Sequence, residues 1–81
     1  MHFNIYGKDN CTFCKAAVSL LEGRKIPYTY FKLGEDFDRD ELFNFFPNAK
    51  TFPQICTTSG QIVGGYTDLQ TFLTVNDNTA Q

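Results

Sequence analysis

Two cysteines separated by two residues, Cys11 and Cys14, lie between a strand-like segment and a helix-like one. Residues 2–6 alternate apolar and polar side chains, which predicts a strand, and residues 12–24 repeat apolar side chains at helical spacing. Cys11 is therefore expected at the N-terminal edge of a helix, with its sulfur near water. The unpaired N–H groups and the helix dipole stabilise an anion there, which lowers the pKa of the Cys11 thiol.

Cys14 follows one helical turn later and is expected to point inward, where it can attack a mixed disulfide formed on Cys11. Such a pair near a strand–helix unit predicts a redox site. Buried thiols or half of a zinc site are the alternatives, but a closed zinc site needs four ligands. The other candidates, Cys56 and His2, are single residues on separate predicted strands, so we expect no bound metal. Cys56 itself is expected to be a small buried apolar residue on a central strand.

Length and charge restrict the class of protein. A chain of 81 residues forms one domain, and its net charge of −2 with no cluster of Lys or Arg argues against nucleic-acid binding. No apolar run approaches the length of a membrane span, and the first residues lack the order of a signal peptide, so a cytoplasmic protein is expected. Three cysteines are too few for a disulfide-stapled secreted scaffold.

The rest of the chain continues the alternation of strands and helices. Residues 28–33 favour a strand, and Asp38 with Glu41 forms a capping box for a second helix that Pro47 ends. Phe37 and Leu42 occupy the positions of a hydrophobic staple. The further expectations are a buried face of Leu42, Phe45 and Phe46, strands at 54–57 and 61–63, a turn at Ser59-Gly60, and a last helix from Thr67 or Asp68 with Thr67 and Gln70 as its capping pair and Leu69, Phe72 and Leu73 packing inward.

These elements predict an α/β domain in which βαβ is followed by ββα. The result is a four-stranded mixed sheet with helices on both faces, in a single domain over residues 1–81. Residues 76–81 are polar and are expected to form a frayed tail.

Three motifs in this order resemble a glutaredoxin. They are Cys11-Thr12-Phe13-Cys14, Thr51-Phe52-Pro53 before the third strand, and Gly64-Gly65-Tyr66-Thr67-Asp68 before the last helix. The resemblance covers residues 2–75 and is closest to the small dithiol kind of bacteria and their phages, whose place would be the host cytoplasm. It implies a thioredoxin-like fold and the reduction of protein disulfides and glutathione mixed disulfides, with glutathione as co-substrate. Ribonucleotide reductase is a protein partner that the resemblance suggests.

The resemblance also implies roles for single residues. Cys11 would be the nucleophile and Cys14 the resolving thiol. Thr12 and Phe13 replace the family's usual Pro-Tyr, so Phe13 keeps the ring without the hydroxyl and Thr12 restores a backbone N–H. Pro53 matches the family's cis-proline, which turns the backbone of Phe52 toward the cysteinyl part of glutathione, with Thr51 bordering the same edge.

The two carboxylates of glutathione need anchors at two separated places. Lys8 and Lys50 match basic positions that bind the glycine carboxylate. Gly65 lets the backbone approach closely, and the helix start at Tyr66, Thr67 and Asp68 offers N–H groups to the γ-glutamyl carboxylate. Asp68 matches the acid that pairs with the γ-glutamyl ammonium, and Thr67 replaces a second acid. The other interpretations remain open: solvated surface lysines, and Asp68 as a helix cap.

Two other functions compete with a glutathione-dependent oxidoreductase. One is a thioredoxin-like hydrogen donor reduced by a flavoprotein reductase, which would need none of the glutathione anchors. The other is a dimer that bridges an iron–sulfur cluster through Cys11 and external glutathione. Cys14 argues against this function, and the absence of proline at position 12 keeps it open. With the first function we expect a monomer with no tightly bound cofactor.

Overall fold

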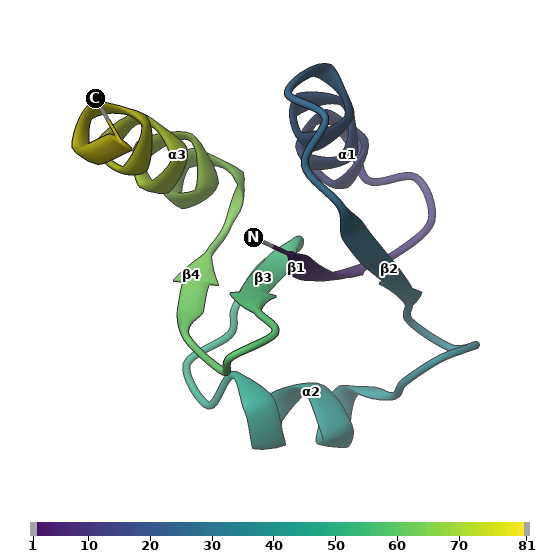
Figure 1. The fold of residues 1–81 in the computed structure, drawn as a ribbon. Coiled ribbons are helices and arrows are strands. Elements are labelled where there is room, and N and C mark those ends of the chain that lie inside the picture. The colour runs from purple at the N-terminus through teal and green to yellow at the C-terminus, as the bar shows by residue number, and fades with distance from the viewer. Residues whose placement is uncertain (1, 81) are drawn as a thin grey trace.

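The computed structural model describes residues 2–80 of the chain, with side chains described over residues 2–75. Strands and helices follow one another in the predicted βαβ and ββα order (Figure 1). Their bounds are β1 Phe3–Gly7, α1 Thr12–Gly23, β2 Tyr28–Lys32, α2 Arg39–Phe45, β3 Gln54–Thr57, β4 Ile62–Gly64 and α3 Tyr66–Ala80. No described helix is both long and apolar enough to cross a membrane.

The four strands form one mixed sheet in the order β2-β1-β3-β4. β1 runs parallel to β2 and antiparallel to β3, and β3 runs antiparallel to β4. Ile5 at the centre of β1 lies between Tyr30 on one side and Ile55 on the other. The predicted mixed sheet is therefore confirmed.

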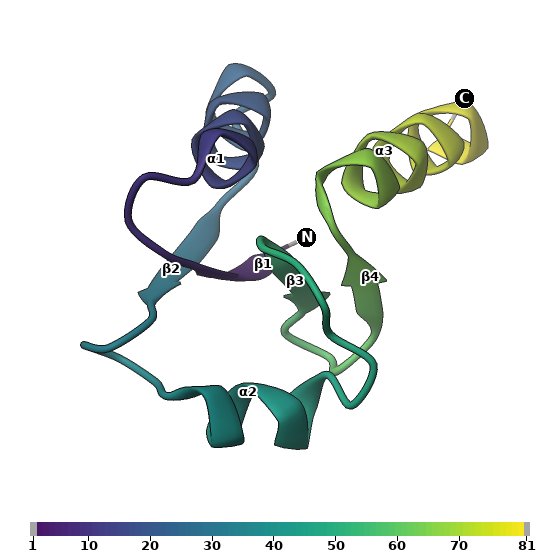
Figure 2. The same cartoon turned by 180° about the vertical axis from the view of Figure 1, so that it is seen from behind.

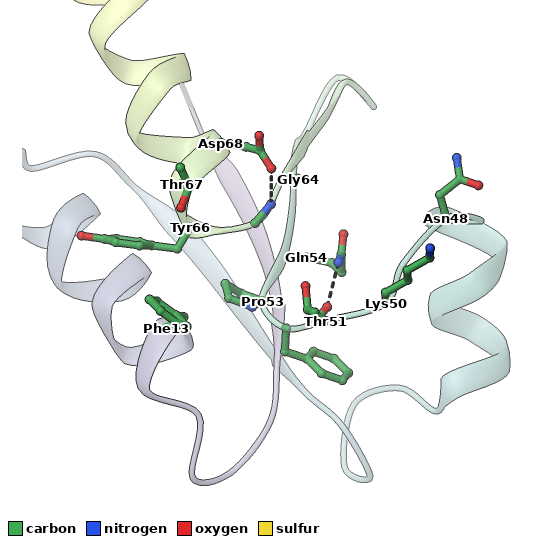
Figure 3. A pocket seen from close by; sticks show the side chains of 12 residues that line it. Phe13, Asn48, Lys50, Thr51, Pro53, Gln54, Gly64, Tyr66, Thr67 and Asp68 are labelled. Atoms are coloured by element: carbon green, nitrogen blue, oxygen red, sulfur yellow. Dashed lines mark hydrogen bonds between the residues drawn. The ribbon is translucent and has the colours of Figure 1, made fainter.

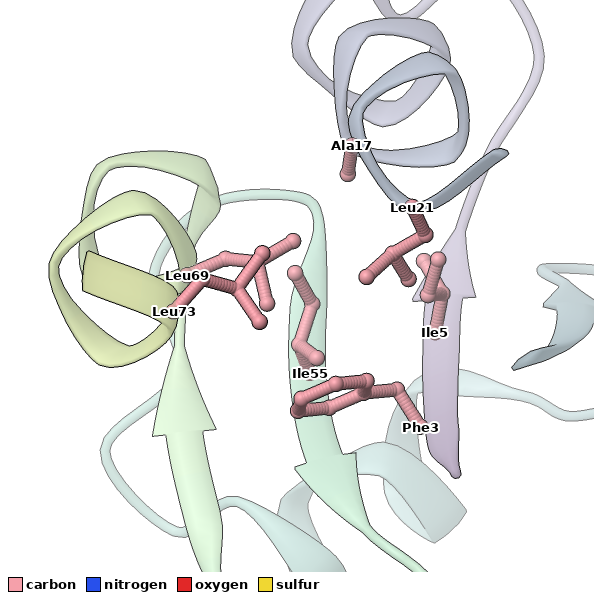
Figure 4. Packing of buried hydrophobic residues seen from close by; sticks show 7 residues of the cluster. All are labelled: Phe3, Ile5, Ala17, Leu21, Ile55, Leu69 and Leu73. Carbon is pink, nitrogen blue, oxygen red and sulfur yellow. The ribbon is translucent and has the colours of Figure 1, made fainter. Parts of the chain in front are cut away.

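Helices cover both faces of this sheet, as predicted. α1 and α3 lie on one face and α2 lies on the other (Figures 1 and 2). Because successive side chains of a strand point to opposite faces, Phe3 and Ile5 of β1 pack under α1 and α3 while Tyr6 packs toward α2. The main core lies between the sheet and the two helices α1 and α3 (Figure 4). It consists of Phe3, Ile5, Ala17, Leu21, Ile55, Leu69 and Leu73.

The second face is held by aromatic side chains beneath α2. Phe37, Leu42 and Phe46 are buried there, and the Tyr6 ring stacks on the Phe31 ring at 4.9 Å between centroids. The predicted capping box is present: the Glu41 amide donates to Asp38 Oδ1 over 2.8 Å, and the Asp38 amide donates to Glu41 Oε1 over 3.1 Å. The staple residues Phe37 and Leu42 share this buried cluster.

The prediction that Phe45 of α2 is buried is wrong. Phe45 is 57% exposed, and its ring meets only the rim of the cluster, 5.9 Å from the Tyr6 ring. α2 has only 7 residues, and the chain leaves the helical conformation at Phe46 with φ −130°. Phe46 therefore turns into the core, while Phe45 stays on the outer surface.

Several observed bounds of strands and helices differ by one residue from the predicted ones. β1 and β4 begin and end one residue later than expected, α1 ends at Gly23, and β2 ends at Lys32 because Leu33 instead forms an isolated bridge with Phe37. The expected frayed tail at 76–81 falls on side chains and a last residue that lie outside the described part of the chain.

The predicted start of the last helix is also wrong. α3 begins at Tyr66, and the Asp68 carboxylate accepts the Gly65 amide over 3.1 Å, so an acid inside the first turn reaches back to cap the helix. Gln70 does not pair with Thr67; its Nε2 donates to the Tyr66 hydroxyl over 3.2 Å. Leu69 and Leu73 are buried as expected, and Phe72 is partly buried against the same core.

Candidate active site

The topology brings three segments to one edge of the sheet. β3 and β4 pair antiparallel, as do β1 and β3, so the end of β1, the start of β3 and the end of β4 lie at the same edge. Tyr6 pairs with Gln54, and Ile55 pairs with Gly64. The loop into α1, the loop before β3 and the start of α3 therefore lie next to one another at that edge.

Cys11 caps α1. Its backbone is extended, with φ −115° and ψ 106°, and its sulfur accepts the Cys14 amide over 3.2 Å. Cys11 and Cys14 are joined by a disulfide, with 5.2 Å between their Cα atoms. The predicted redox pair at the start of a helix is therefore present in its oxidised form.

The two sulfur-bearing residues differ in exposure. Cys14 is 1% exposed and points inward as predicted, whereas Cys11 retains 8% exposure. Gly7 makes room for this arrangement, because a Cβ there would lie 3.0 Å from the Cys14 sulfur and would run into the Tyr30 ring. The cysteine nearer to solvent is thus the first of the pair.

The loop between β1 and α1 is fastened to β2. The Lys32 ammonium lies 3.1 Å from the Asp9 carboxylate and 3.3 Å from that of Glu35, and hydrogen bonds to these two acids raise the pKa of Lys32. Burial raises the pKa of Tyr30, whose hydroxyl donates to the Lys8 carbonyl over 3.4 Å. These contacts hold the residues that lead into Cys11.

The loop before β3 carries the predicted cis-proline. The Phe52-Pro53 peptide bond is cis, and Pro53 is fully buried. Gln54 is a buried polar residue, and its Nε2 donates to the Thr51 carbonyl over 2.7 Å. A side-chain hydrogen bond from the start of β3 therefore sets the shape of this loop.

A cleft of about 480 Å³ lies between α1, this loop and the start of α3 (Figure 3). It brings together nearly all the residues assigned to glutathione by resemblance, and its lining consists of Phe13, Asn48, Lys50, Thr51, Phe52, Pro53, Gln54, Gly64, Gly65, Tyr66, Thr67 and Asp68. Asn48 and Gln54 were not predicted, although a glutamine directly after Pro53 and before the apolar Ile55 and Cys56 is a signal of a polar role. Neither cysteine belongs to this lining; Phe13 between them does.

Two aromatic rings join the helices on either side of the cleft. Phe13 is 59% exposed, and its ring stacks on the Tyr66 ring with 5.9 Å between centroids and 30° between planes. Phe13 comes from α1 and Tyr66 from α3 (Figure 3). This stack forms an apolar wall next to the dithiol.

Lys8 is placed differently from the other predicted anchors. Lys8 does not belong to the described residues that line the cleft. Its ammonium lies over the Phe52 ring, 5.6 Å from the centroid. Lys50, by contrast, lines the cleft.

Cys56 lies on a central strand as expected, but the prediction that it is buried is wrong. Cys56 is half-buried on the interior strand β3, where burial raises the pKa of its thiol and a hydrogen bond with Asn4 opposes that shift. It lies at the edge of the aromatic cluster under α2. In the described part of the chain, no three His, Cys, Asp or Glu side chains are grouped so that they would hold a metal ion.

A dithiol at the N-terminus of a helix is the reactive group of a thiol–disulfide oxidoreductase. A family model described as Glutaredoxin matches residues 4–63, and the chain belongs to the glutaredoxin family. No curated protein sequence matches the chain.

Solved structures agree with this assignment. Glutaredoxin 1 from Francisella tularensis, complexed with cacodylate, has a TM-score of 0.78 and 20% identity, covering 95% of this chain and 96% of that one. Reduced Escherichia coli glutaredoxin has a TM-score of 0.74 and 27% identity, covering 96% and 99%. A buckwheat glutaredoxin–glutathione complex has a TM-score of 0.71 and 19% identity, covering 84% and 64%. The fold is therefore the thioredoxin-like fold that was expected.

The start of α3 generates a stability prediction. Gly64 has φ +116°, and a Cβ there would lie 2.9 Å from Asp68 Cγ, whereas Gly60 has φ +97° and open space around it. We expect Gly60→Ala to lower the free energy of unfolding by about 1–2 kcal/mol through its positive φ alone. Gly64→Ala should cost about 1 kcal/mol more, because it also displaces the Asp68 cap. Urea unfolding of both variants measures the difference, and equal losses would contradict the role of the cap.

Proposed function

We propose that the protein is a glutathione-dependent thiol–disulfide oxidoreductase that reduces protein disulfides and glutathione mixed disulfides. The observation that carries the proposal is the cleft beside the dithiol, which has a cation at one end and a capped helix start at the other. Glutathione is a tripeptide with a carboxylate at each end, so it needs anchors at two such places. The glutathione complex of the buckwheat relative supports this choice of ligand.

The chemistry follows from the dithiol. In the reduced protein the Cys11 thiolate attacks a substrate disulfide, forms a mixed disulfide, and releases the other sulfur as a thiolate. Cys14 then attacks Cys11 and releases the reduced substrate, which leaves the Cys11–Cys14 disulfide seen in the structure. One glutathione thiolate reopens that disulfide by bonding to Cys11, and a second removes the first as glutathione disulfide. Two electrons pass from two glutathiones to the substrate.

Each part of the cleft has a role in this proposal. Lys50 pairs with the glycine carboxylate, and the backbone of Phe52 pairs with the cysteinyl residue. The amides of Tyr66, Thr67 and Asp68 at the start of α3 receive the γ-glutamyl carboxylate. One Asp68 oxygen accepts the Gly65 amide, and the other remains for the γ-glutamyl ammonium, so the capping and binding roles of Asp68 are compatible.

The finer assignments rest on family resemblance. We propose disulfide-bearing proteins as partners, with ribonucleotide reductase as one candidate, and a monomer acting in a cytoplasm. Thr51 and Gly65 contribute close backbone approach in the cleft, and Phe13 contributes its ring.

A coupled assay tests the proposal against the reductase-dependent alternative. With glutathione, glutathione reductase and NADPH, we expect the protein to reduce a glutathionylated peptide, because the cleft has anchors that a reductase would not use. When thioredoxin reductase replaces glutathione and glutathione reductase, the rate of NADPH oxidation should be at most about a tenth as high. Turnover with thioredoxin reductase alone would assign the protein to the other class.

The exposures of the two cysteines predict a division of labour. Cys11→Ser should abolish reduction of both protein disulfides and glutathione mixed disulfides, because the more exposed cysteine makes the first attack. Cys14→Ser should abolish reduction of a protein disulfide such as that of insulin but keep part of the activity on a glutathionylated peptide, since a second glutathione can resolve Cys11. The two assays run on the two variants measure this, with Cys56→Ser as the matched control thiol. Equal loss for both variants in both assays would refute the assignment.

A further inference from the structure

Lys8 and Phe52 form a contact that joins two loops of the site. The Lys8 ammonium lies over the Phe52 ring at 5.6 Å from its centroid. A cation over the face of an aromatic ring is attracted by the ring's quadrupole, and an aliphatic side chain offers no such attraction.

The Phe52 ring is held by its packing, whereas the Lys8 side chain is exposed. Phe52 packs against the buried cluster beneath α2, with 6.4 Å between its centroid and that of Phe37. Lys8 is exposed and makes no ion pair with any described residue. The nearest acid in sequence, Asp9, is taken by Lys32 at 3.1 Å. The Phe52 ring is therefore what determines where the Lys8 charge lies.

That position is at the margin of the cleft. Phe52 belongs to the cleft lining while Lys8 does not, and Lys50 lies on the same wall two residues before Phe52. The backbone of Lys8 is also held, because its carbonyl accepts the Tyr30 hydroxyl over 3.4 Å. The backbone and the ammonium of Lys8 therefore each have a contact that favours this position.

We infer that Phe52 is a positioning residue whose ring holds the Lys8 ammonium beside the cleft, where its charge favours the anionic end of an incoming thiol. The inference rests on the proposed use of glutathione and assigns to the Phe52 side chain a role separate from that of its backbone. Anionic thiols should gain from the Phe52 ring, and uncharged thiols should not.

The first test follows the contact itself and needs no glutathione. In ¹H–¹³C NMR spectra, the ε-methylene protons of Lys8 should be shifted upfield by the ring current. Phe52→Leu should remove that shift, and Phe52→Tyr, which keeps the ring, should retain it. A Lys8 signal at the position of an ordinary exposed lysine in the unsubstituted protein would overturn the inference.

The second test compares two reductants of the Cys11–Cys14 disulfide, glutathione and the uncharged 2-mercaptoethanol. The ratio of their rate constants should fall two- to fivefold, roughly the range expected for an exposed cation–π contact, in Phe52→Leu but not in Phe52→Tyr. In the Lys8→Ala background, Phe52→Leu should produce no further fall. A similar fall in both backgrounds would show that the ring acts on the substrate directly and would overturn the inference.

The two reductants distinguish failure of the positioning role of Phe52 from failure of the proposed function. A preference for glutathione that survives Phe52→Leu refutes the positioning role and leaves the proposed function intact. An unsubstituted protein that reacts no better with glutathione than with 2-mercaptoethanol refutes the proposed function, and the role of the Lys8 charge with it.

Discussion

The hydrogen bond from the Cys14 amide to the Cys11 sulfur is the contact on which the rest of the site depends. It places the sulfur at the start of α1, where unpaired amides and the helix dipole favour a negative charge. α1 is itself held by Ala17 and Leu21, which are fully buried in the main core. The close packing of α1 against the core therefore fixes the position of the Cys11 sulfur.

Aromatic side chains perform much of the local organisation around that atom. Phe13 stacks on Tyr66 and so links the dithiol helix to the helix that ends the cleft. Phe52 joins the cleft wall to the aromatic cluster beneath α2 and lies under the Lys8 ammonium. Phe13 stands where the family resemblance predicts a tyrosine, so the chain keeps the family's fold with a different ring beside the dithiol.

Much of this could be predicted from the sequence, and the failures have local causes. The order of the elements, the dithiol at a helix start and the Asp38–Glu41 capping box followed from periodicity and capping rules. The burial of Phe45 was predicted wrongly because a 7-residue helix does not complete enough turns to define one face from spacing alone. The start of α3 was misplaced because Asp68 caps from inside the helix rather than before it.

The site shows the same limit. Motifs identified the residues that line the cleft, but no pattern indicated that Lys8 lies over Phe52 or that Gln54 holds the Thr51 carbonyl. The first contact depends on how two loops fold against each other, and the second depends on the turn that the chain makes at the cis peptide bond before Pro53.

The central claim is that α1 stabilises a thiolate on Cys11, and the pH dependence of alkylation tests it most directly. The reduced protein is treated with iodoacetamide across a range of pH, and the Cys11 peptide is quantified by mass spectrometry. We expect a midpoint below the value near 8.5 of a free cysteine, because the helix start favours the thiolate. A midpoint equal to that of free cysteine would contradict it.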